Sequence, residues 1–196
     1  MYLATAVSIL AVVLLVCGQE AVPLAQTQAQ VDSINEQHPG WTAGINKKFA
    51  NITLEQAKKF LGLAEEPLPE SEQITRVQAS PRSILALPDS FDARTKWPSC
   101  FQPIRDQAGC GACWAFASTS AFGIRLCIAS NGAVQVPMSP QYLTSCDTAD
   151  NGCSGGTLSG GWRFMQSSGG VADTDYPFTS GNGNSGTCNL KASAKK

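Results

Sequence analysis

Histidine is nearly absent from this sequence. His38 is the only one, and no histidine follows it. We interpret His38 as an ordinary surface residue, and we expect no metal site and no cofactor. Strong charge is missing as well: the formal net charge is −1, so no electrostatic field would attract nucleic acid or an anionic membrane. We also find no internal repeat, no coiled-coil pattern and no nucleotide-binding loop.

The sequence also lacks an apolar run long enough to cross a membrane. Residues 3–17 form an apolar run that is shorter than the roughly 20 residues of a spanning helix. Because the run lies next to Met1 and ends at Gly18, it predicts a signal peptide over residues 1–18. Its start lacks Lys and Arg, which leaves a membrane anchor as the alternative. The signal peptide predicts a secreted or lysosomal/endosomal protein without stable membrane association.

Cysteine, in contrast, is plentiful. Eight cysteines are present, and removal of the predicted signal peptide takes away Cys17. An odd number of remaining cysteines in a secreted chain indicates disulfides plus one free thiol. The connectivity of the pairs does not follow from the sequence.

One cysteine, Cys113, is placed to act as a nucleophile. It follows the turn Cys110-Gly111-Ala112 and begins a stretch with helical character that continues to Ile128. A thiol at a helix N-terminus is favoured as the thiolate by the backbone N–H groups and the helix dipole. Six residues upstream, the amide of Gln107 would donate to a developing oxyanion. A C-x-x-C redox or metal half-site and purely structural cysteines remain the alternatives for this motif.

The segment Cys-Gly-Ala-Cys-Trp at 110–114 resembles the papain-like cysteine peptidases. The resemblance implies that Cys113 is the catalytic nucleophile and that Gln107 helps to hold the oxyanion. The family carries a C-x-G-G segment for binding substrate backbone, which matches Gly155 and Gly156, with Gly111 beside them. It also implies three disulfides, which are Cys110–Cys153, Cys146–Cys188 and, as in cathepsin B, Cys100–Cys127.

The region before residue 87 is similar to a short propeptide of the cathepsin B type. The similarity lies in Ile34-Asn35 and in the stretch from Trp41 to Phe49, although an ordinary helical segment is the alternative. We expect a signal peptide at 1–18, a propeptide and activation linker at 19–86, and the peptidase region at 87–196. The propeptide would act as an intramolecular inhibitor. The sequon at Asn51 predicts N-glycosylation in this region.

Helix signals recur along the chain. Apolar spacing predicts a helix over residues 53–61, with Thr53 and Gln56 as a capping box. In the peptidase region we expect a main helix from Cys113 to Ile128, with small residues that permit close packing. After it we expect a short helix that Ser139 caps. A third helix is expected over Leu158–Ser168, where glycine ends it. The Gly- and Asn-rich residues 179–187 predict a loop.

The sequence also departs from the family pattern. In papain and the cathepsins the catalytic His and Asn lie about 130–150 residues after the nucleophile, and the sequence ends well before that distance. We therefore expect an α+β papain-like fold truncated to its mainly helical left subdomain and preceded by a small propeptide. The β-rich half, which would complete the cleft, is expected to be missing. The segment before Cys188 also lacks the His-rich occluding loop of cathepsin B, which favours an endopeptidase.

These observations predict a papain-family cysteine peptidase zymogen that acts on peptides or proteins and is inactive in this truncated form. Two other classes remain open. One is a propeptide-type inhibitor that binds the clefts of related peptidases through residues 30–65. The other is a non-catalytic, disulfide-stabilised secreted binding domain, in which Cys113 would be oxidised or inert.

Overall fold

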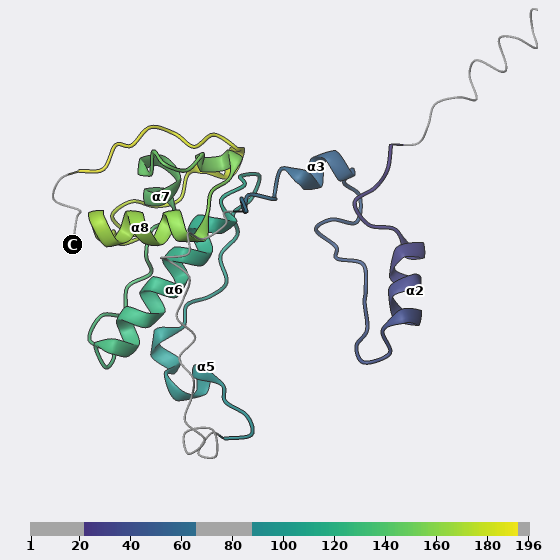
Figure 1. Cartoon of the computed structure of the whole chain (residues 1–196), viewed down its shortest axis with the longest axis horizontal. Helices are drawn as coiled ribbons and strands as arrows, with labels where there is room; N and C mark the ends of the chain where they lie inside the picture. The colour runs from purple at the N-terminus through teal and green to yellow at the C-terminus, as the bar shows by residue number, and fades with distance from the viewer. Residues whose placement is uncertain (1–21, 66–87, 192–196) are drawn as a thin grey trace, which may run out of the picture. The chain divides into compact units, whose positions relative to one another are not determined.

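A computed structural model describes residues 22–65 and 88–191 (Figure 1). The predicted signal peptide at 1–18, most of the proline-rich linker and its boundary near residue 86 lie outside the described residues. The chain divides into two compact units, one ending at Lys58 and the other starting at Lys59. Each unit is described by itself.

The first unit contains helices α2 (Gln28–Gln37) and α3 (Leu54–Lys58). Both begin with a Thr–Gln capping box, which satisfies backbone N–H groups at the helix start. At α3, the Thr53 hydroxyl accepts a hydrogen bond from the Gln56 N–H at 3.1 Å, and the Gln56 side chain accepts one from the Thr53 N–H at 2.8 Å. The predicted cap of this helix is confirmed.

The predicted length of that helix is wrong. We expected it to reach Leu61, but α3 ends at Lys58. Beyond it the backbone is no longer helical, and the Ala64 N–H and the Gly62 carbonyl both hydrogen bond to Gly156 in the peptidase region. Gly62 also has a low helix propensity. Pairing with a distant segment therefore replaces the last turn that the local pattern indicated.

In the second unit the longest helix is α6 (Cys113–Ala129), which contacts both α7 (Pro140–Cys146) and α8 (Leu158–Ser168) (Figure 1). These are the three helices expected from the sequence, with bounds within a few residues. Among its described residues, the unit also has the shorter elements α5 (Ala93–Lys96), η2 (Pro98–Cys100), η3 (Gly152–Ser154) and η4 (Ser180–Asn182). The described residues form isolated β-bridges rather than extended strands.

Small residues let these helices approach closely, as the composition of α6 predicted. Ala115 and Ser118 of α6 are buried, and a Cβ placed on Gly161 of α8 would lie 2.9 Å from the Ser118 hydroxyl oxygen. Larger side chains then fill the core. Trp114 and Leu143 are fully buried, and they contribute about 1.5–3 kcal/mol each relative to exposure.

Helix α7 holds the C-terminal part of the unit. Ser139 caps it, because its hydroxyl accepts from the Tyr142 N–H at 3.0 Å, and it also donates to the Tyr176 carbonyl. Gln141 accepts from the N–H groups of Thr179 and Ser180 at 2.7 and 3.1 Å. These bonds hold Ser180–Asn182 as η4 within the loop that was predicted over 179–187. The expectation of a loop is corrected for η4.

Three disulfides join six cysteines of this unit, and Cys113 is a free thiol among the described residues. The bridges are the pairs implied by the family resemblance: Cys100–Cys127, Cys110–Cys153 and Cys146–Cys188. In the loop-entropy picture, bridges that close loops of this size stabilise the fold by about 4 kcal/mol each.

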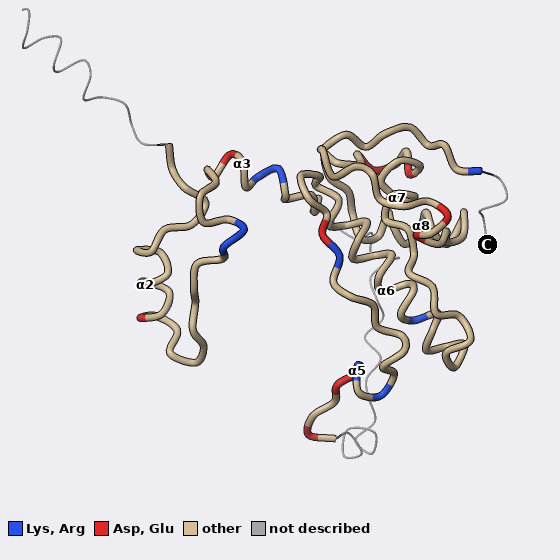
Figure 2. Tube along the Cα trace, turned by 180° about the vertical axis from the view of Figure 1, so that it is seen from behind, with Lys and Arg blue, Asp and Glu red and all other residues tan. Residues whose placement is uncertain are grey.

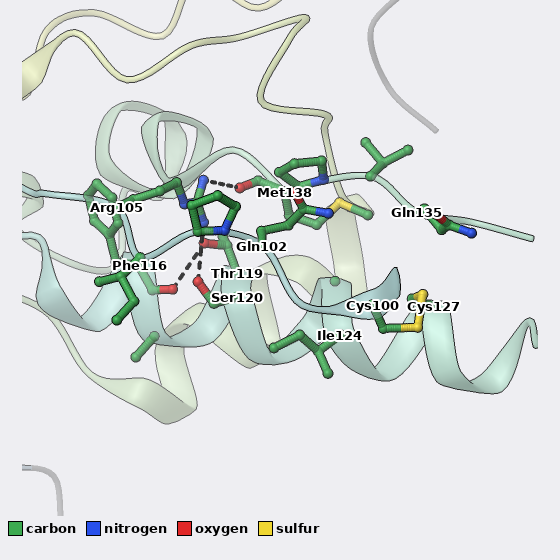
Figure 3. A pocket seen from close by; sticks show the side chains of 16 residues that line it. Cys100, Gln102, Arg105, Phe116, Thr119, Ser120, Ile124, Cys127, Gln135 and Met138 are labelled. Atoms are coloured by element: carbon green, nitrogen blue, oxygen red, sulfur yellow. Dashed lines mark hydrogen bonds between the residues drawn. A yellow bond between two sulfur atoms is a disulfide. The ribbon is translucent and has the colours of Figure 1, made fainter. Parts of the chain in front are cut away.

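One face of α6 borders an apolar hollow of about 320 Å³ (Figure 3). Phe116 and Ile124 of α6 line it, together with Met138 and Ile104. Ile104 is completely exposed. Charged residues are sparse on α6, α7 and α8 (Figure 2). Within the described ranges, no helix has the length and apolar character needed to cross a membrane.

Candidate active site

Cys113 is the first residue of α6, and its side chain is half-buried. The preceding residue, Ala112, offers no side chain to cap the helix. Helices normally satisfy their first backbone N–H groups with a Ser, Thr, Asp or Asn cap. The absence of such a cap leaves the positive end of the α6 dipole directed at the region of Cys113, which is the arrangement that favours an oxyanion.

Gln107 lies in the loop before α6, with its side-chain amide directed by two acceptors. Its Nε2 donates to the Cys110 carbonyl at 2.8 Å and to the Phe60 carbonyl at 2.9 Å. The first bond orients the amide from within its own loop. The second shows that this amide binds the carbonyl oxygen of another peptide segment.

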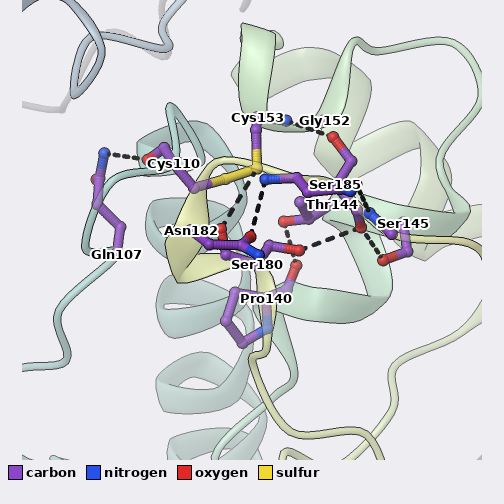
Figure 4. The surroundings of a disulfide bond; sticks show 12 residues. Gln107, Cys110, Pro140, Thr144, Ser145, Gly152, Cys153, Ser180, Asn182 and Ser185 are labelled. Carbon is purple, nitrogen blue, oxygen red and sulfur yellow. Dashed lines mark hydrogen bonds between the residues drawn. A yellow bond between two sulfur atoms is a disulfide. The ribbon is translucent and has the colours of Figure 1, made fainter.

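Several bonds join the segment of the predicted substrate-binding glycines to the nucleophile loop, among them the disulfide drawn in Figure 4. The Cys110–Cys153 disulfide links the two segments, and the Gly111 N–H donates to the Cys153 carbonyl at 3.0 Å. The indole of Trp114, next to the nucleophile, donates to the Gly152 carbonyl at 3.1 Å. The structure therefore brings Cys113, Gln107, Gly111, Gly155 and Gly156 into one region of the second unit.

A short peptide segment already lies against these glycines. The Gly156 N–H donates to the Gly62 carbonyl at 2.8 Å, and the Gly156 carbonyl accepts from the Ala64 N–H at 2.9 Å. Leu63 and Gly156 form a parallel β-bridge. Together with the bond from Gln107 to Phe60, these contacts hold residues 60–64 through their backbone, as one strand holds another.

Residues 60–64 approach the nucleophile loop so closely that the contact requires glycine. A Cβ on Gly62 would overlap the Gly111 carbonyl, and a Cβ on Gly111 would lie 2.6 Å from the Cys153 carbonyl oxygen. Gly155 has φ +118°, a conformation that residues with a side chain rarely adopt. The leucines beside Gly62 remain largely exposed, so the backbone makes the specific contacts.

Other predicted residues lie elsewhere. His38 belongs to the first unit, where it ends α2 and stacks on Trp41 with ring centroids 6.3 Å apart. Asn51 is exposed in the same unit, so burial would not prevent its predicted glycosylation. The described residues contain no cluster of three or more His, Cys, Asp or Glu side chains that suits a metal ion.

Residues 60–64 and Asp150 were missed by the sequence analysis. A glycine between two leucines directly after a helical stretch was the available signal for the first. Asp150 accepts from the Thr157 N–H at 2.8 Å through Oδ1 and lies beneath Gly156. Nothing in the local sequence indicates this role, because the contact joins residues on either side of η3.

Comparison with known proteins agrees with this geometry. The model of the papain family of cysteine proteases matches residues 87–196. The chain belongs to this family. Among solved structures, it is similar to procathepsin B S9 from Trypanosoma congolense, with a TM-score of 0.70 and 30% identity, over 83% of this chain and 57% of that one.

Curated relatives support the same family assignment. The chain is 38% identical over 171 residues to cathepsin B-like CP3 of Giardia intestinalis, covering 85% of this chain and 55% of the relative. It is also 38% identical over 166 residues to cathepsin B-like cysteine proteinase 4 of Caenorhabditis elegans, covering 82% and 48%. The chain thus spans about half the length of the curated relatives that it matches. Its fold is that of the mainly helical part of papain-like procathepsins.

Proposed function

We propose that the whole protein is a cysteine endopeptidase made as a zymogen and delivered by its signal peptide to a secreted or lysosomal/endosomal location. Residues 1–18 are the signal peptide, residues 19–86 the propeptide and activation linker, and residues 87–196 the N-terminal half of the peptidase domain. Cys113 is the nucleophile, and Gly111, Gly155 and Gly156 bind the backbone of a peptide or protein substrate.

The contact of residues 60–64 with Gln107 and Gly156 carries this proposal. A peptide carbonyl accepts from the amide that would hold an oxyanion, and the adjoining backbone pairs with Gly156. A substrate peptide needs the same two kinds of contact. The propeptide then inhibits by occupying the groove that a substrate requires, and cleavage in the linker would allow it to leave.

In the reaction, the Cys113 thiolate attacks the scissile carbonyl carbon, and a tetrahedral oxyanion forms. The Gln107 amide and the N–H groups at the start of α6 stabilise that charge. Collapse of the intermediate breaks the C–N bond, with a proton delivered to the leaving amine, and leaves an acyl-enzyme that water hydrolyses.

The proton needs a general acid, which the family takes from a histidine. The sole histidine in this sequence is His38, and it matches no catalytic position of the family. General acid–base catalysis is worth about 10²–10⁴-fold, and members of one catalytic unit are strongly non-additive. We therefore expect that residues 1–196 alone do not turn over peptides.

Covalent labelling tests the proposal. A peptide that carries a chloromethyl ketone should label Cys113 faster than a simple haloacetamide does, because Gly155 and Gly156 hold the peptide beside the thiolate. Cleavage within the linker should raise the peptidyl rate further. The Cys113→Ala variant is the control, and peptide hydrolysis by the chain should not exceed it. Mapping that places Cys113 in a disulfide, or equal rates for the two reagents, would contradict the proposal.

A further inference from the structure

Arg105 holds the loop that precedes the nucleophile helix. The backbone of residues 101–107 has no regular secondary structure, and residues 102–104 are exposed to solvent. Arg105 differs from these neighbours, since only 24% of its side chain is exposed. Because the loop has no helix or strand of its own, its place beside α6 depends on side-chain contacts such as those of Arg105.

The guanidinium group of Arg105 contacts three separate segments, and Figure 3 draws its bonds to two of them. Nη1 donates to the Met138 carbonyl at 2.9 Å and to Asp173 Oδ1 at 3.4 Å, and Nη2 donates to the Ser120 hydroxyl at 3.2 Å. Cζ lies 5.3 Å from the centroid of the Phe116 ring, a distance at which an aromatic face attracts a cation. A planar guanidinium group makes these contacts together, whereas the single ammonium group of a lysine cannot.

Two of these contacts are with the helix that begins at Cys113. Phe116 lies in the first turn of α6, and Ser120 lies in the second. Gln107 follows Arg105 by two residues, and two residues span at most about 7 Å. The contacts of the guanidinium group therefore restrict how far the Gln107 backbone can move relative to the start of α6.

Beyond Gln107 the chain is held by a second set of contacts. The Gly109 N–H donates to the Gly181 carbonyl at 2.8 Å, and Cys110 forms a disulfide with Cys153. Gln107 lies between this set and the contacts of the guanidinium group. Loss of either set would free one side of the turn that carries the Gln107 amide.

We propose that Arg105 is a positioning residue for the Gln107 amide. Arg105 touches no reacting atom; it holds the loop against α6 so that Gln107 Nε2 is directed at the oxyanion. The positioning role rests on the proposed function, since that is what assigns the oxyanion to Gln107. A misplacement of about 1 Å can cost about 10²-fold in rate, so a loop held on one side only should stabilise the oxyanion less well.

Arg105→Met tests this role, because methionine keeps an unbranched apolar side chain and removes every donor. Arg125→Met is the matched control. Arg125 also lies over an aromatic ring, with its Cζ 5.6 Å from the Trp162 centroid, but it belongs to the C-terminal part of α6. Both variants lose a cation–π contact, and only Arg105→Met releases the loop. Arg105→Lys keeps the charge and should give an intermediate result.

A peptidyl aldehyde and the matching peptidyl alcohol provide the first readout, with the full chain. The Cys113 thiol adds to the aldehyde: an S–C bond forms, the C=O π bond breaks, and the oxygen takes the thiol proton. The alcohol makes the same backbone contacts without an adduct. Competition with residues 60–64 affects both compounds equally, so the ratio of their dissociation constants reports the stabilisation of the adduct oxygen.

We expect Arg105→Met to lower the preference for the aldehyde over the alcohol about tenfold, since loss of an oxyanion donor outright costs about 10²–10³-fold. Arg125→Met should leave the preference unchanged. A merely structural role would change the binding of both compounds alike and leave their ratio as it was. An equal ratio in Arg105→Met and Arg125→Met would overturn the proposal.

Hydrogen exchange followed by mass spectrometry tests the loop itself. The Gly109 amide should exchange about tenfold faster in Arg105→Met, because the loop opens more often, and at the original rate in Arg125→Met. Ser120→Ala serves if Arg105→Met does not fold: Ser120 is exposed, and alanine is the better helix former. Loss of one hydrogen bond should still raise exchange at Gly109 about threefold. Unchanged exchange in Ser120→Ala and Arg105→Met would contradict the proposal.

These measurements separate failure of this inference from failure of the proposed function. If the unaltered chain prefers the aldehyde and Arg105→Met has the same preference, the positioning role is wrong and the proposed function stands. If the unaltered chain binds the aldehyde no better than the alcohol, the proposed function is wrong. The role of Arg105 toward the oxyanion is then wrong with it, while faster exchange at Gly109 in Arg105→Met would still show that Arg105 holds the loop.

Discussion

Single glycines decide how residues 60–64 pack against the rest of the second unit. Gly62 and Gly111 approach so closely that a Cβ on Gly62 would overlap the Gly111 carbonyl. Neither partner can move aside as a flexible side chain would, because both contacting groups are backbone. The backbone pairing of residues 60–64 is therefore sensitive to one methyl group.

Gly62→Ala should displace residues 60–64 from Gly156 and expose Cys113. Overpacking of this kind costs about 1–3 kcal/mol, and about 1.4 kcal/mol changes an equilibrium constant tenfold. We therefore expect roughly tenfold faster alkylation of Cys113 by a small haloacetamide. Gly44→Ala is the matched control, since a Cβ there has no neighbour within 4 Å. Equal alkylation rates in the two variants would show that residues 60–64 do not cover the thiol.

At the scale of elements, caps and buried side chains hold the helices in place. Ser139 is 1% exposed, begins α7 and at the same time donates to the Tyr176 carbonyl. Its hydroxyl therefore joins a helix start to a segment 37 residues later. A surface cap would serve only its own helix.

Ser139→Ala should destabilise the chain by about 2 kcal/mol. Loss of the cap accounts for about 1 kcal/mol, and the Tyr176 carbonyl left without its donor accounts for the remainder. Urea unfolding with the disulfides intact measures the change. Ser167→Ala on the exposed face of α8 removes a local bond and should cost no more than about 0.5 kcal/mol. Equal costs for both variants would contradict the linking role of Ser139.

For the whole molecule, the hollow on α6 is an apolar surface of the second unit. Phe116, Ile124 and Met138 line it (Figure 3). The side chain of Ile104, which also lines it, is fully exposed to solvent. The curated relatives extend beyond the part that this chain matches, since the match covers 55% of cathepsin B-like CP3. The family resemblance places a second subdomain against this half, and such a partner would cover the hollow.

The chain alone should therefore bind a hydrophobic dye and self-associate, since exposed apolar surface promotes both. Dye fluorescence and sedimentation measure these properties. Ile104→Ser should lower dye binding and shift the population toward monomer, while Leu24→Ser, at an exposed leucine of the first unit, should not shift association. A monodisperse chain that binds no dye would show that this face needs no partner.

The local pattern of the sequence determined much of this protein. Cys113 at the start of α6, the Ser139 cap and the glycine end of α8 are short-range features, because capping and periodicity involve residues within a turn or two. The family motif then implied the three disulfides and the glycines that bind backbone.

Tertiary structure alone decided the rest. The early end of α3, the seating of residues 60–64 on Gly156 and the folding of η4 against Gln141 all depend on contacts between segments far apart in the chain. Local propensities are worth fractions of a kcal/mol per residue, so a few buried long-range hydrogen bonds outweigh them.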